Sequence, residues 1–432
     1  MNETGYFFDP GKLRRKPAAI LGAGVSGNGA GTLLRALEWE YQIYDERGRA
    51  FGLAEAQACS VVVVSPGFKV DHPWLVHART AGVEIFGEAD FASMFWPGPV
   101  VAVTGTNGKT TLVRFIERLL REAGRPARAL GNVGESFAAA AAEKPRSDET
   151  AVLELSSFQT ETLRLLRPEV VVWTNFAEDH IDRHRNLTDY FRAKGRLVEA
   201  LPEGGTFLAG ASVVESAEAL EILLTRSPLV ARAQEASGTD LPAFSPFRAL
   251  PQRETLALGL AFAREAGIPQ EVVKKVLAEF RGDPHRMEKV ATVGRTTFWN
   301  DSKATNFSAA LAACRHFAGK ALWIGGGKDK GGDLTGFARR LSDLVAGAYL
   351  VGETGPVMAK ALADLGSPVT LCESLAKAVR AAYDDAREIA DVLFSPGFAS
   401  LDAYSGYEER GKSFVNLVLN LKSPARGRTA SG

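Results

Sequence analysis

The chain has 432 residues, of which 46% are hydrophobic, and its 51 lysines and arginines balance its 51 aspartates and glutamates. A chain of this length predicts about three domains, and zero net charge gives no electrostatic case for nucleic acid or an anionic membrane surface as a partner. No apolar run approaches the ~20 residues of a membrane-spanning helix, residues 1–16 lack the order of a signal peptide, and the cysteines are widely separated. We therefore expect a cytoplasmic globular protein with reduced thiols.

Segments typical of strands alternate with segments typical of helices through most of the chain, which indicates α/β architecture with parallel sheets. The Pro97-Gly98-Pro99 linker and a change of pattern near Asp283 divide the chain into three predicted domains, residues 1–97, 98–283 and 284–432. The predicted strands are Ala18–Leu21, Tyr41–Tyr44, Val61–Val64, Val100–Val103, Ala151–Leu155, Val170–Trp173, Thr296–Trp299, Ala321–Ile324, Ala348–Val351 and Val392–Phe394.

The first predicted strand runs into the glycine-rich turn Gly22-Ala23-Gly24-Val25-Ser26-Gly27, and the second ends at Asp45. This spacing is typical of dinucleotide-binding turns, in which glycines admit a pyrophosphate and the acid accepts a ribose hydroxyl. Ser65-Pro66-Gly67 follows the third strand, at the sheet edge where ligands of open sheets gather. These turns fit a redox dinucleotide or a nucleotide-linked substrate, and ordinary strand-to-helix turns are the alternative.

The central block opens with the most informative segment, in which an apolar strand runs into Gly105-Thr106-Asn107-Gly108-Lys109-Thr110-Thr111 and then into an amphipathic helix. The backbone N–H groups of such a loop converge on an anion at the positive N-terminus of the helix. Lys109 would reach the β- and γ-phosphates of a nucleotide, and the Thr110 hydroxyl would bind Mg²⁺. Val103 replaces the first glycine of the common phosphate-loop pattern, so the loop is a variant. An ordinary turn is again the alternative.

Acidic and histidine side chains follow the next two strands. Glu154 ends one strand beside the loop, where a carboxylate suits Mg²⁺, because this ion prefers oxygen ligands. His180 lies within Glu178-Asp179-His180-Ile181-Asp182 after the following strand, and the acids around it favour a metal ligand over a lone loop histidine. Lys194, in the helix predicted for Tyr190–Leu201, would by itself be interpreted as a solvent-facing lysine.

Polar clusters also follow the predicted strands of the third block, so they can share one edge of a sheet. Cations and hydroxyls dominate these clusters, which suits the binding of carboxylates and phosphates. The clusters are Asp283–Glu288, Asn300–Asn306, Gly325–Lys330 and Ser395–Ser400.

Five motifs together resemble the Mur ligases, the ATP-dependent amide-forming enzymes of bacterial peptidoglycan synthesis. They occur in the family's order and read Gly-Thr-Asn-Gly-Lys-Thr, Glu-Leu-Ser-Ser-Phe-Gln, Glu-Asp-His-Ile-Asp-Arg-His, Pro-His-Arg-Met-Glu and Asp-Ser-Lys-Ala-Thr-Asn. Leu-Ser-Ser-Phe-Gln and Ser-Pro-Gly-Phe-Ala-Ser-Leu-Asp most resemble the branch that adds D-glutamate to UDP-N-acetylmuramoyl-L-alanine.

The resemblance implies a Rossmann-like N-terminal sheet, a central mononucleotide-binding domain with a phosphate loop, and a Rossmann-like C-terminal domain. It implies that ATP phosphorylates the substrate carboxylate to an acyl-phosphate, which the amine of D-glutamate then attacks. The pathway is cytoplasmic and builds the cell wall, so it serves cell shape and cell division. A monomer is expected, with no nucleic acid or membrane partner and no nicotinamide.

The resemblance also implies roles for single residues. Lys109 stabilises the transferring phosphoryl group, Thr110 and Glu154 hold one Mg²⁺, and His180 holds a second. Lys194 matches the lysine that the family carbamylates, which would turn an ammonium into an oxygen ligand for Mg²⁺. The implied ATP contacts are Gly105, Thr106, Asn107, Gly108, Lys109, Thr110, Thr111, Gln252, Arg286 and Asp301. The implied contacts with the UDP-linked substrate are Gly22, Val25, Ser26, Asp45, Ser65, Gly67 and Asn132, and those with D-glutamate are Lys303, Thr305, Lys330, Ser400, Leu401 and Tyr407.

The sequence departs from the family before the third domain, where His-Asn-x-x-Asn usually precedes an alanine-rich helix and its asparagines reach the adenine. Here the aligned residues are Pro251-Gln252-Arg253-Glu254-Thr255. Gln252 could replace one amide at longer reach, but Thr255 cannot present two opposed hydrogen-bonding groups to a purine. Tyr407 also stands where a phenylalanine is expected. Three alternatives stay open: a superfamily member that adds another amino acid or acts on folate, a binding protein without turnover, and a dinucleotide oxidoreductase built on residues 22–27.

Overall fold

A computed structural model describes residues 14–242, 245–248, 252–317, 320–386 and 391–421 of the chain. The described chain divides into two compact units. The first holds the described residues up to Phe176 together with Arg183–Gly238 and Glu254–Leu277. The second holds Ala177–Asp182, the described part of Thr239–Arg253 and the described residues from Ala278 onward. Residues 1–13, from which we expect no export signal, lie outside the described ranges. Within those ranges, no helix combines the length and apolar character that crossing a bilayer requires.

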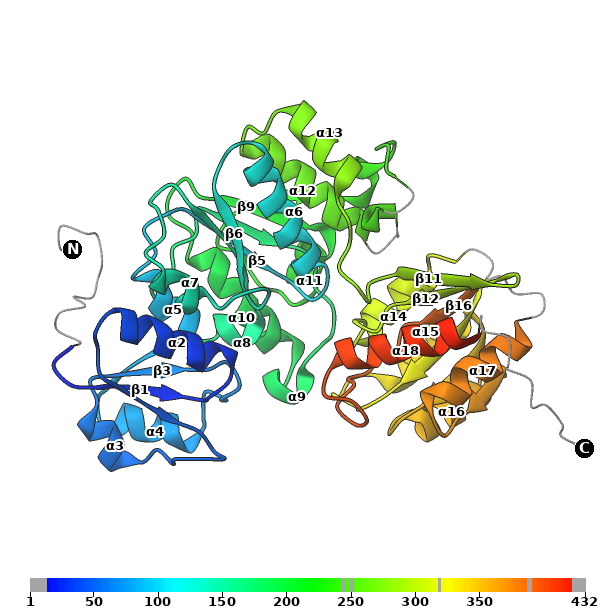
Figure 1. The fold of residues 1–432 in the computed structure, drawn as a ribbon, viewed down its shortest axis with the longest axis horizontal. Coiled ribbons are helices and arrows are strands. Elements are labelled where there is room, and N and C mark those ends of the chain that lie inside the picture. The colour runs from blue at the N-terminus through cyan, green and yellow to red at the C-terminus, as the bar shows by residue number, and fades with distance from the viewer. Residues whose placement is uncertain (1–13, 243–244, 249–251, 318–319, 387–390, 422–432) are drawn as a thin grey trace, which may run out of the picture. The chain divides into compact units, whose positions relative to one another are not determined.

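The first unit contains a four-stranded parallel sheet in the order β2-β1-β3-β4. Every residue of β1 and β3 is buried, because helices cover both faces of the sheet (Figure 1). Apolar side chains of α2 and α5 pack on one face, and those of α3 and α4 pack on the other. The elements are β1 (Ala18–Leu21), α2 (Val25–Ala36), β2 (Tyr41–Tyr44), α3 (Leu53–Ala58), β3 (Val61–Val64), α4 (Pro73–Thr80), β4 (Glu84–Gly87) and α5 (Glu88–Ser93).

A six-stranded parallel sheet in the order β10-β9-β8-β5-β7-β6 follows in the chain. Its strands are β5 (Val100–Thr104), β6 (Ala127–Gly131), β7 (Thr150–Glu154), β8 (Val170–Trp173), β9 (Thr206–Gly210) and β10 (Leu229–Ala231). The helices of this part of the chain are α6 (Lys109–Glu122), α7 (Phe137–Ala142), α8 (Ser157–Thr160), α9 (Ile181–His184), α10 (Leu187–Glu199), α11 (Ala211–Ala219), α12 (Arg253–Glu265) and α13 (Gln270–Glu279), with 3₁₀ turns η1 (Ala233–Ala236) and η2 (Pro246–Arg248).

Two buried carboxylates on α5 join the two sheets of the first unit. Glu88 Oε1 accepts a hydrogen bond of 2.7 Å from the Ala138 N–H at the start of α7. Asp90 accepts the N–H groups of three consecutive residues, those of 164–166, at 2.7–3.0 Å. Helix α2 also packs along α7. These contacts explain why residues on both sides of the Pro97-Gly98-Pro99 segment belong to one compact unit.

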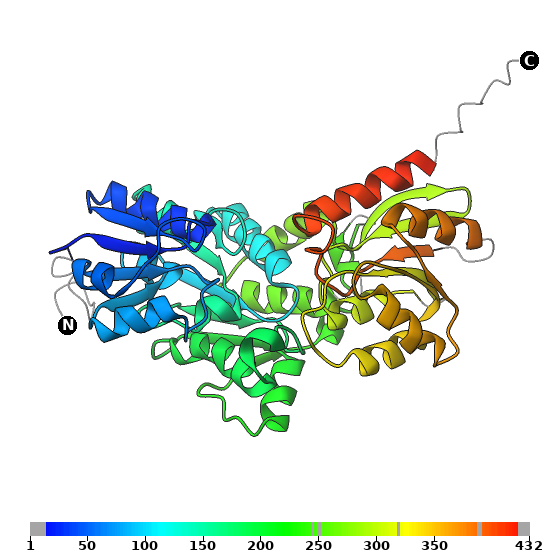
Figure 2. The ribbon, with the colours of Figure 1, turned by 90° about the horizontal axis from the view of Figure 1, so that it is seen from below.

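The second unit contains a six-stranded sheet in the order β11-β12-β16-β13-β14-β15. Helices α14, α15 and α16 pack on one face, and α17 and α18 pack on the other (Figure 2). The elements are β11 (Glu288–Val293), β12 (Thr296–Asn300), α14 (Phe307–Cys314), β13 (Ala321–Gly326), α15 (Leu334–Ser342), β14 (Val345–Val351), α16 (Gly355–Ala363), β15 (Val369–Leu371), α17 (Leu375–Asp385), β16 (Asp391–Phe394) and α18 (Tyr407–Leu421).

Strands β4, β6, β9, β10, β11 and β15 are absent from the predicted set, and two differences from the expectation have a direct physical reason. Strand β11 runs antiparallel to β12 at the edge of an otherwise parallel sheet. Only the short turn at Gly294-Arg295 joins these strands, and so short a connection can link only antiparallel neighbours. The helix predicted for Tyr190–Leu201 begins earlier, at Leu187, because the Asn186 side chain caps it by accepting the Asp189 N–H.

Candidate active site

The phosphate loop connects β5 to α6 in the first unit, and residues after β8 hold its backbone. The Thr106 N–H donates to the carbonyl oxygen of Asn175 at 3.1 Å. The Asn107 N–H donates to the side-chain oxygen of Asn175 at 2.9 Å, and Asn175 Nδ2 donates to the Asn107 carbonyl at 3.1 Å. Thr174 Oγ1 donates to that same carbonyl at 2.6 Å. The protein itself therefore fixes the conformation of the loop.

A glycine allows the loop to turn tightly into α6. Gly108 has φ +81°, in the left-handed region that favours glycine, and no side chain caps the helix there. The first amides of α6 are therefore the part of the helix that an anion would bind. A Cβ atom on Gly108 would lie 2.5 Å from Thr255 Oγ1. Buried Thr255 thus packs against the loop. The sequence comparison, which considered only hydrogen bonds to the adenine, did not predict this packing role.

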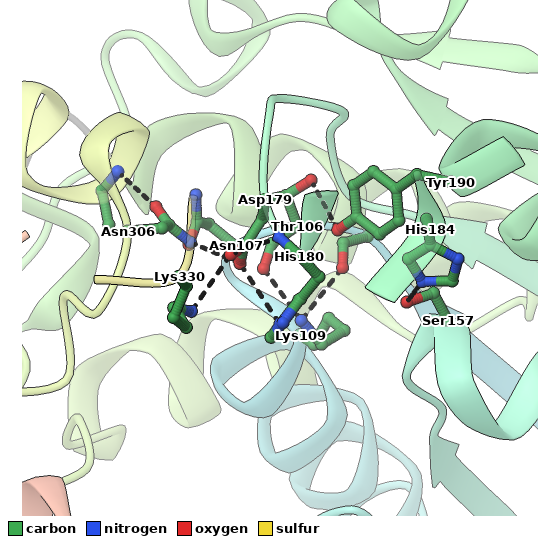
Figure 3. A network of polar contacts seen from close by, with 12 residues as sticks. Thr106, Asn107, Lys109, Ser157, Asp179, His180, His184, Tyr190, Asn306 and Lys330 are labelled. Carbon is green, nitrogen blue, oxygen red and sulfur yellow. Dashed lines mark hydrogen bonds and ion pairs between the residues drawn. The ribbon is translucent and has the colours of Figure 1, made fainter. Parts of the chain in front are cut away.

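Two lysine ammonium groups meet at one carbonyl oxygen of the loop. Lys109 Nζ donates to the carbonyl oxygens of Gly105 and Thr106, both at 2.9 Å (Figure 3). Lys194 Nζ donates to the Gly105 carbonyl at 2.8 Å and lies 4.7 Å from the ring centroid of Tyr190. Only 1% of Lys194 is exposed. The solvent-facing interpretation of Lys194 is therefore wrong, because α10 directs this side chain to the phosphate loop.

Glu154, at the end of β7, presents an oxygen that suits a cation. Its side chain is buried, Oε1 accepts a bond of 3.3 Å from Asn132 Nδ2, and Oε2 has no hydrogen-bond partner among the described residues. Such a buried oxygen is costly unless a donor or cation meets it. Buried Thr110 and Thr111 place hydroxyls at the start of α6. Within the described ranges, no three His, Cys, Asp or Glu side chains gather as a metal site, so a Mg²⁺ ion here would also need hydroxyl, carbamate or phosphate oxygens.

Two side chains support the turn after β1 at Ala23, because Asn28 Nδ2 donates to the Ala23 carbonyl at 2.9 Å and Asp45 accepts the Ala23 N–H. Asp45 Oδ2 accepts the Ala23 N–H at 2.9 Å, and bonds from backbone N–H groups hold the pKa of this carboxyl below its usual value. Gly27 is required because a Cβ atom there would lie 1.8 Å from the carbonyl oxygen of Gly22. Val25, which is 75% exposed, begins α2 on the open side of the turn.

The turn after β3 lies beside the turn after β1. A Cβ atom on Gly22 would lie 2.7 Å from Ser65 Oγ, a buried oxygen without a hydrogen-bond partner in the described parts of the chain. The predicted contacts of the UDP-linked substrate in the two turns, including Ser26 and Gly67, therefore share one edge of the first sheet. Asn132 stands apart from them, because it contacts Glu154 near the phosphate loop.

In the second unit, Asp301 follows β12 and is held from two sides. Ser395 Oγ donates to its Oδ2 at 2.7 Å, and the Met287 N–H donates to its Oδ1 at 3.2 Å. Burial raises the pKa of Asp301 to about 6, although these two bonds and the charge of Arg286 act in the opposite direction. Asp301 and Arg286, both predicted ATP contacts, are therefore near enough to interact electrostatically.

A cavity of about 650 Å³ in the second unit has Arg286 and other basic side chains in its lining, together with the acidic Asp283 and Glu288. Gln252, the predicted adenine contact, lies just before α12 and is buried. Its Oε1 has no hydrogen-bond partner among the described residues, so it is an acceptor that suits an amino group. The other basic residues that line the cavity are Arg248, Arg253, Arg281, Lys289 and His316.

Lys303 and Tyr407, two of the residues predicted to contact D-glutamate, lie together. Lys303 Nζ is 5.2 Å from the Tyr407 ring centroid, so the ammonium faces an aromatic ring. Ser400 is buried, whereas 64% of Leu401 is exposed. Thr305 lies two residues before α14. Within this predicted set, Leu401 is the side chain that the structure leaves most exposed.

Lys330, the remaining predicted D-glutamate contact, is paired with Asp179. Lys330 Nζ donates to Asp179 Oδ1 at 3.1 Å, and Asn306 Nδ2 donates to Asp179 Oδ2 at 2.9 Å (Figure 3). Burial acts to raise the pKa of Asp179, but Lys330, His180 and the two hydrogen bonds outweigh it and hold the pKa below its usual value. His180 has φ +53°, which is unusual for a residue other than glycine.

Sequence reasoning missed three residues of these networks. Asp179 lies inside a motif that we used, yet only the structure shows its contact with Lys330. Asn175 and Tyr190 support the loop from β8 and α10. A polar Thr174-Asn175 pair directly after a buried strand was the available signal for Asn175, since parallel neighbours end at the same sheet edge.

The fold and the site define an α/β protein with a phosphate loop and a separate unit that carries basic side chains at its strand ends. The family model described as the Mur ligase middle domain matches residues 103–227. The model described as the Mur ligase glutamate ligase domain matches residues 285–398. Together with the relatives that follow, these matches show that the chain belongs to the Mur ligase family.

Similar proteins of this family span nearly the whole chain. The chain is 32% identical to the UDP-N-acetylmuramoylalanine–D-glutamate ligase of Jannaschia sp., with 94% of this chain and 99% of the relative covered. It is 31% identical to the ligase of the same name from Acidobacterium capsulatum, with 97% and 100% covered. The corresponding ligase of Aquifex aeolicus is 32% identical, with 92% and 97% covered.

Solved structures of Mur ligases share the fold. UDP-N-acetylmuramate-alanine ligase of Thermotoga maritima aligns with a TM-score of 0.58 at 16% identity, covering 94% of this chain and 99% of that one. The MurF ligase of Thermotoga maritima in complex with ADP aligns with a TM-score of 0.56 at 15% identity, covering 96% of each chain. At this identity the likeness concerns the fold alone. Family membership leaves the oxidoreductase alternative without support.

Proposed function

We propose that this protein ligates D-glutamate to UDP-N-acetylmuramoyl-L-alanine at the expense of ATP, in cytoplasmic peptidoglycan precursor synthesis. The observation that carries the proposal is the nearly full-length similarity to ligases named for this reaction, at 31–32% identity. The phosphate loop, with two lysines at one carbonyl oxygen, supports the ATP-dependent part. We place the functional domains at residues 1–97, 98–283 and 284–432, and we expect a monomer.

The reaction that we propose has two steps. A carboxylate oxygen of the UDP-linked substrate attacks the γ-phosphorus of ATP, and ADP leaves. The amine of D-glutamate then attacks the acyl carbon, the amine gives up a proton, and phosphate leaves. Lys109, at the start of α6, supplies positive charge where the γ-phosphoryl group transfers. The amides of the phosphate loop hold the remaining phosphate oxygens.

The residues around the loop fit a Mg²⁺ site. Glu154 Oε2, which is buried and lacks a hydrogen-bond partner in the described ranges, would bind one ion together with the Thr110 hydroxyl. Lys194 would serve the ion as a carbamate, which would also replace one of the two positive charges at the Gly105 carbonyl by a negative one. We assign His180 to a second ion. Bound Mg²⁺ would neutralise charge on the phosphate oxygens during transfer.

The substrates would bind at the sheet edges. The turns that contain Gly22, Asp45 and Ser65 suit the uridine diphosphate. Lys303 and Lys330 suit the carboxylates of D-glutamate, and Asp179 becomes available to its ammonium group when Lys330 turns to a carboxylate. Gln252, Arg286 and Asp301 suit the nucleoside of ATP.

A phosphate-release assay tests the proposal. The purified protein receives UDP-N-acetylmuramoyl-L-alanine, Mg²⁺, ATP and D-glutamate, and controls omit each substrate or replace D-glutamate by L-glutamate or glycine. Release that requires both the muramoyl substrate and D-glutamate is the expected result. Release with another amino acid or with a folate substrate would contradict the proposed specificity. Substrate binding without phosphate release would favour a protein that has lost turnover. The departure of Gln252 and Thr255 from the asparagines usual in the family motivates this alternative.

A further inference from the structure

Four polar side chains connect the turn after β3 with the surroundings of the phosphate loop. They are Ser157, Glu161, Arg183 and His184, all in the first unit, and we call them the Glu161 cluster. The side chains of Arg183 and His184 are only 9% and 2% exposed. Both residues end the Glu-Asp-His-Ile-Asp-Arg-His motif, but the function proposed above gives neither of them a task.

The guanidinium group of Arg183 donates hydrogen bonds to two parts of the chain, the turn after β3 and Glu161. Nη1 donates to the Gly67 carbonyl at 3.1 Å, and Nη2 donates to the Phe68 carbonyl at 2.8 Å. Nη2 also donates to Glu161 Oε2 at 2.9 Å. The guanidinium carbon lies 4.5 Å from the Phe158 ring centroid, so an aromatic face supports the group. A planar guanidinium can meet acceptors in several fixed directions, which a lysine ammonium on its flexible stem does not reproduce.

Glu161 contacts both Arg183 and His184. Glu161 Oε1 is 3.2 Å from His184 Nδ1, while Oε2 accepts from Arg183. His184 Nε2 is 2.8 Å from Ser157 Oγ. In the tautomer that donates from Nδ1 to the carboxylate, Nε2 accepts the Ser157 hydroxyl proton. Both ring nitrogens and both carboxylate oxygens thus have partners inside the protein, which fixes the orientation of all four side chains.

The far side of the cluster reaches the phosphate loop through Tyr190. The His184 and Tyr190 rings are 5.1 Å apart between centroids, and Tyr190 Oη is 3.3 Å from Thr106 Oγ1 in the loop. Figure 3 shows His184 between Ser157 and Tyr190, with Tyr190 directed toward Thr106. Ser157 lies three residues after Glu154, the carboxylate that suits Mg²⁺. A continuous set of polar and ring contacts therefore runs from Gly67 to Thr106.

We infer that the Glu161 cluster, through Arg183, sets the position of the turn after β3 relative to the phosphate loop. The inference rests on the proposed function, in which one substrate molecule spans both places. Its uridine diphosphate binds at the turns of the first sheet, and its carboxylate receives a phosphoryl group at the loop. Arg183 is then a positioning residue, because it contacts the turn through backbone carbonyls and not through the substrate. Displacing a reacting carboxylate by about 1 Å can cost on the order of 100-fold in rate.

Kinetics of Arg183→Met and Arg183→Lys test the inference. We expect kcat/KM for UDP-N-acetylmuramoyl-L-alanine to fall roughly 10- to 100-fold in Arg183→Met, with KM for ATP changed less than about 3-fold. Arg183→Lys should recover only a minor part of the loss. Affinity for UDP alone, measured by titration calorimetry, should stay within about 3-fold of wild type, because UDP contacts only one end of the connected region. A loss of UDP affinity as large as the loss of kcat/KM would overturn the inference, and so would unchanged kinetics.

A matched control and a double-mutant cycle separate positioning from general destabilisation. Arg185→Met removes an arginine that is 85% exposed and pairs with Asp189 on the surface, so its kinetics should stay within about 2-fold of wild type. Glu161→Gln combined with Arg183→Met should lose less than the product of the single losses, because both act through one cluster. Independent losses would contradict a shared cluster. If wild type itself shows no D-glutamate-dependent release, the proposed function fails. The double-mutant cycle can then be measured as changes in thermal stability, which still tests whether Glu161 and Arg183 act together.

Discussion

The phosphate loop and the turn after β1 are both glycine-rich connections from a parallel strand to a helix, but the protein supports them differently. The phosphate loop is held by Asn175 and Thr174 and by two lysine side chains around the Gly105 carbonyl. The turn after β1 exposes Ala23–Val25 and is held at Ala23 by the side chains of Asp45 and Asn28.

This difference follows from what each turn must do. Phosphoryl transfer proceeds only when the reacting atoms are aligned within a fraction of an ångström, so the loop at which it occurs must be rigid. Holding a diphosphate at some distance from the chemistry needs mainly backbone that a pyrophosphate can approach closely. We therefore expect substitutions around the phosphate loop to change the rate of reaction, and substitutions at the first turn to change only the affinity for the UDP-linked substrate.

The largest effect should come from Lys109→Ala. Removal of the ammonium group that faces the transferring phosphoryl group should lower kcat by about 10³-fold or more. The fold should persist, since this half-buried side chain donates to backbone carbonyl oxygens of the loop itself. Phosphate release measures the rate, and circular dichroism checks the fold. Arg121→Ala, which changes an exposed residue of the same helix, is the control. A loss smaller than tenfold would contradict the assigned role.

Lys194→Ala should lower kcat roughly 100-fold, because it removes the proposed carbamate ligand. Added formate or acetate should restore part of the activity by supplying an oxygen ligand in the same space. Lys194→Arg keeps a positive charge but cannot form a carbamate, so it should be as inactive as the alanine variant. Arg192→Ala, at an exposed position of α10, is the control. Unchanged activity in Lys194→Ala would eliminate the carbamate proposal.

Glu88→Gln tests the contact through which α5 joins the two sheets that carry the two turns. Burial raises the pKa of Glu88 from 4.5 to about 7, so between these pH values the folded state keeps a proton that the unfolded state has lost. The free energy of unfolding that Glu88 contributes is therefore fully present below pH about 4.5 and falls by about 3 kcal/mol as pH rises through about 7. Urea titrations at pH 5 and pH 8 should show that Glu88→Gln gains stability relative to wild type at the higher pH.

Glu84→Gln is the control for that comparison, since Glu84 lies on β4 near α5 but pairs with Arg164 at the surface. Its stability relative to wild type should vary little between the two pH values. A Glu88→Gln difference that is equally independent of pH would show that the carboxyl is not protonated in the folded protein.

Asp45→Asn should have the smallest effect on activity. An asparagine can keep one oxygen as acceptor for the Ala23 N–H but loses the negative charge, so KM for the UDP-linked substrate should rise only a few-fold, roughly 2- to 5-fold. KM for ATP and kcat should not change. Glu46→Gln, at the exposed neighbouring position, is the control. A large fall in kcat would remove the distinction between the two turns.

The sequence predicts the strands best where apolar residues are continuous and turn signals bound them. Ala18–Leu21, Tyr41–Tyr44, Val61–Val64 and Val170–Trp173 have the predicted bounds, because each is a short strand of a parallel sheet and all but the edge strand Tyr41–Tyr44 are largely buried. The edge strand β11 was missed: only Ala291 and Val293 of its residues are buried, a register shift between Lys289 and Ala291 interrupts its alternation, and its partner β12 determines its pairing. The short β10 and the 3₁₀ turns η1 and η2 have no periodicity to detect.

Predicting the candidate site from sequence succeeded for residues that follow strands and failed for residues that reach the site from elsewhere. Glu154 ends β7 and Lys109 begins α6 after the loop that follows β5, so both lie at the sheet edge where a parallel topology gathers side chains. Lys194 could be placed only by resemblance, since its burial depends on the orientation of α10. Glu161 and Tyr190 gave no signal, because their partners are distant in sequence and only the fold brings them together.

The three amides that Asp90 accepts bear on how this chain could be dissected. A fragment that begins at Pro99 would lose α5, and with it the carboxylate that satisfies the N–H groups of residues 164–166. The same cut would expose Phe137 and neighbouring apolar side chains of α7, which now pack in a core shared with α2 and α5. A separately expressed ATP-binding fragment would thus need a polar replacement for that apolar surface to stay in solution.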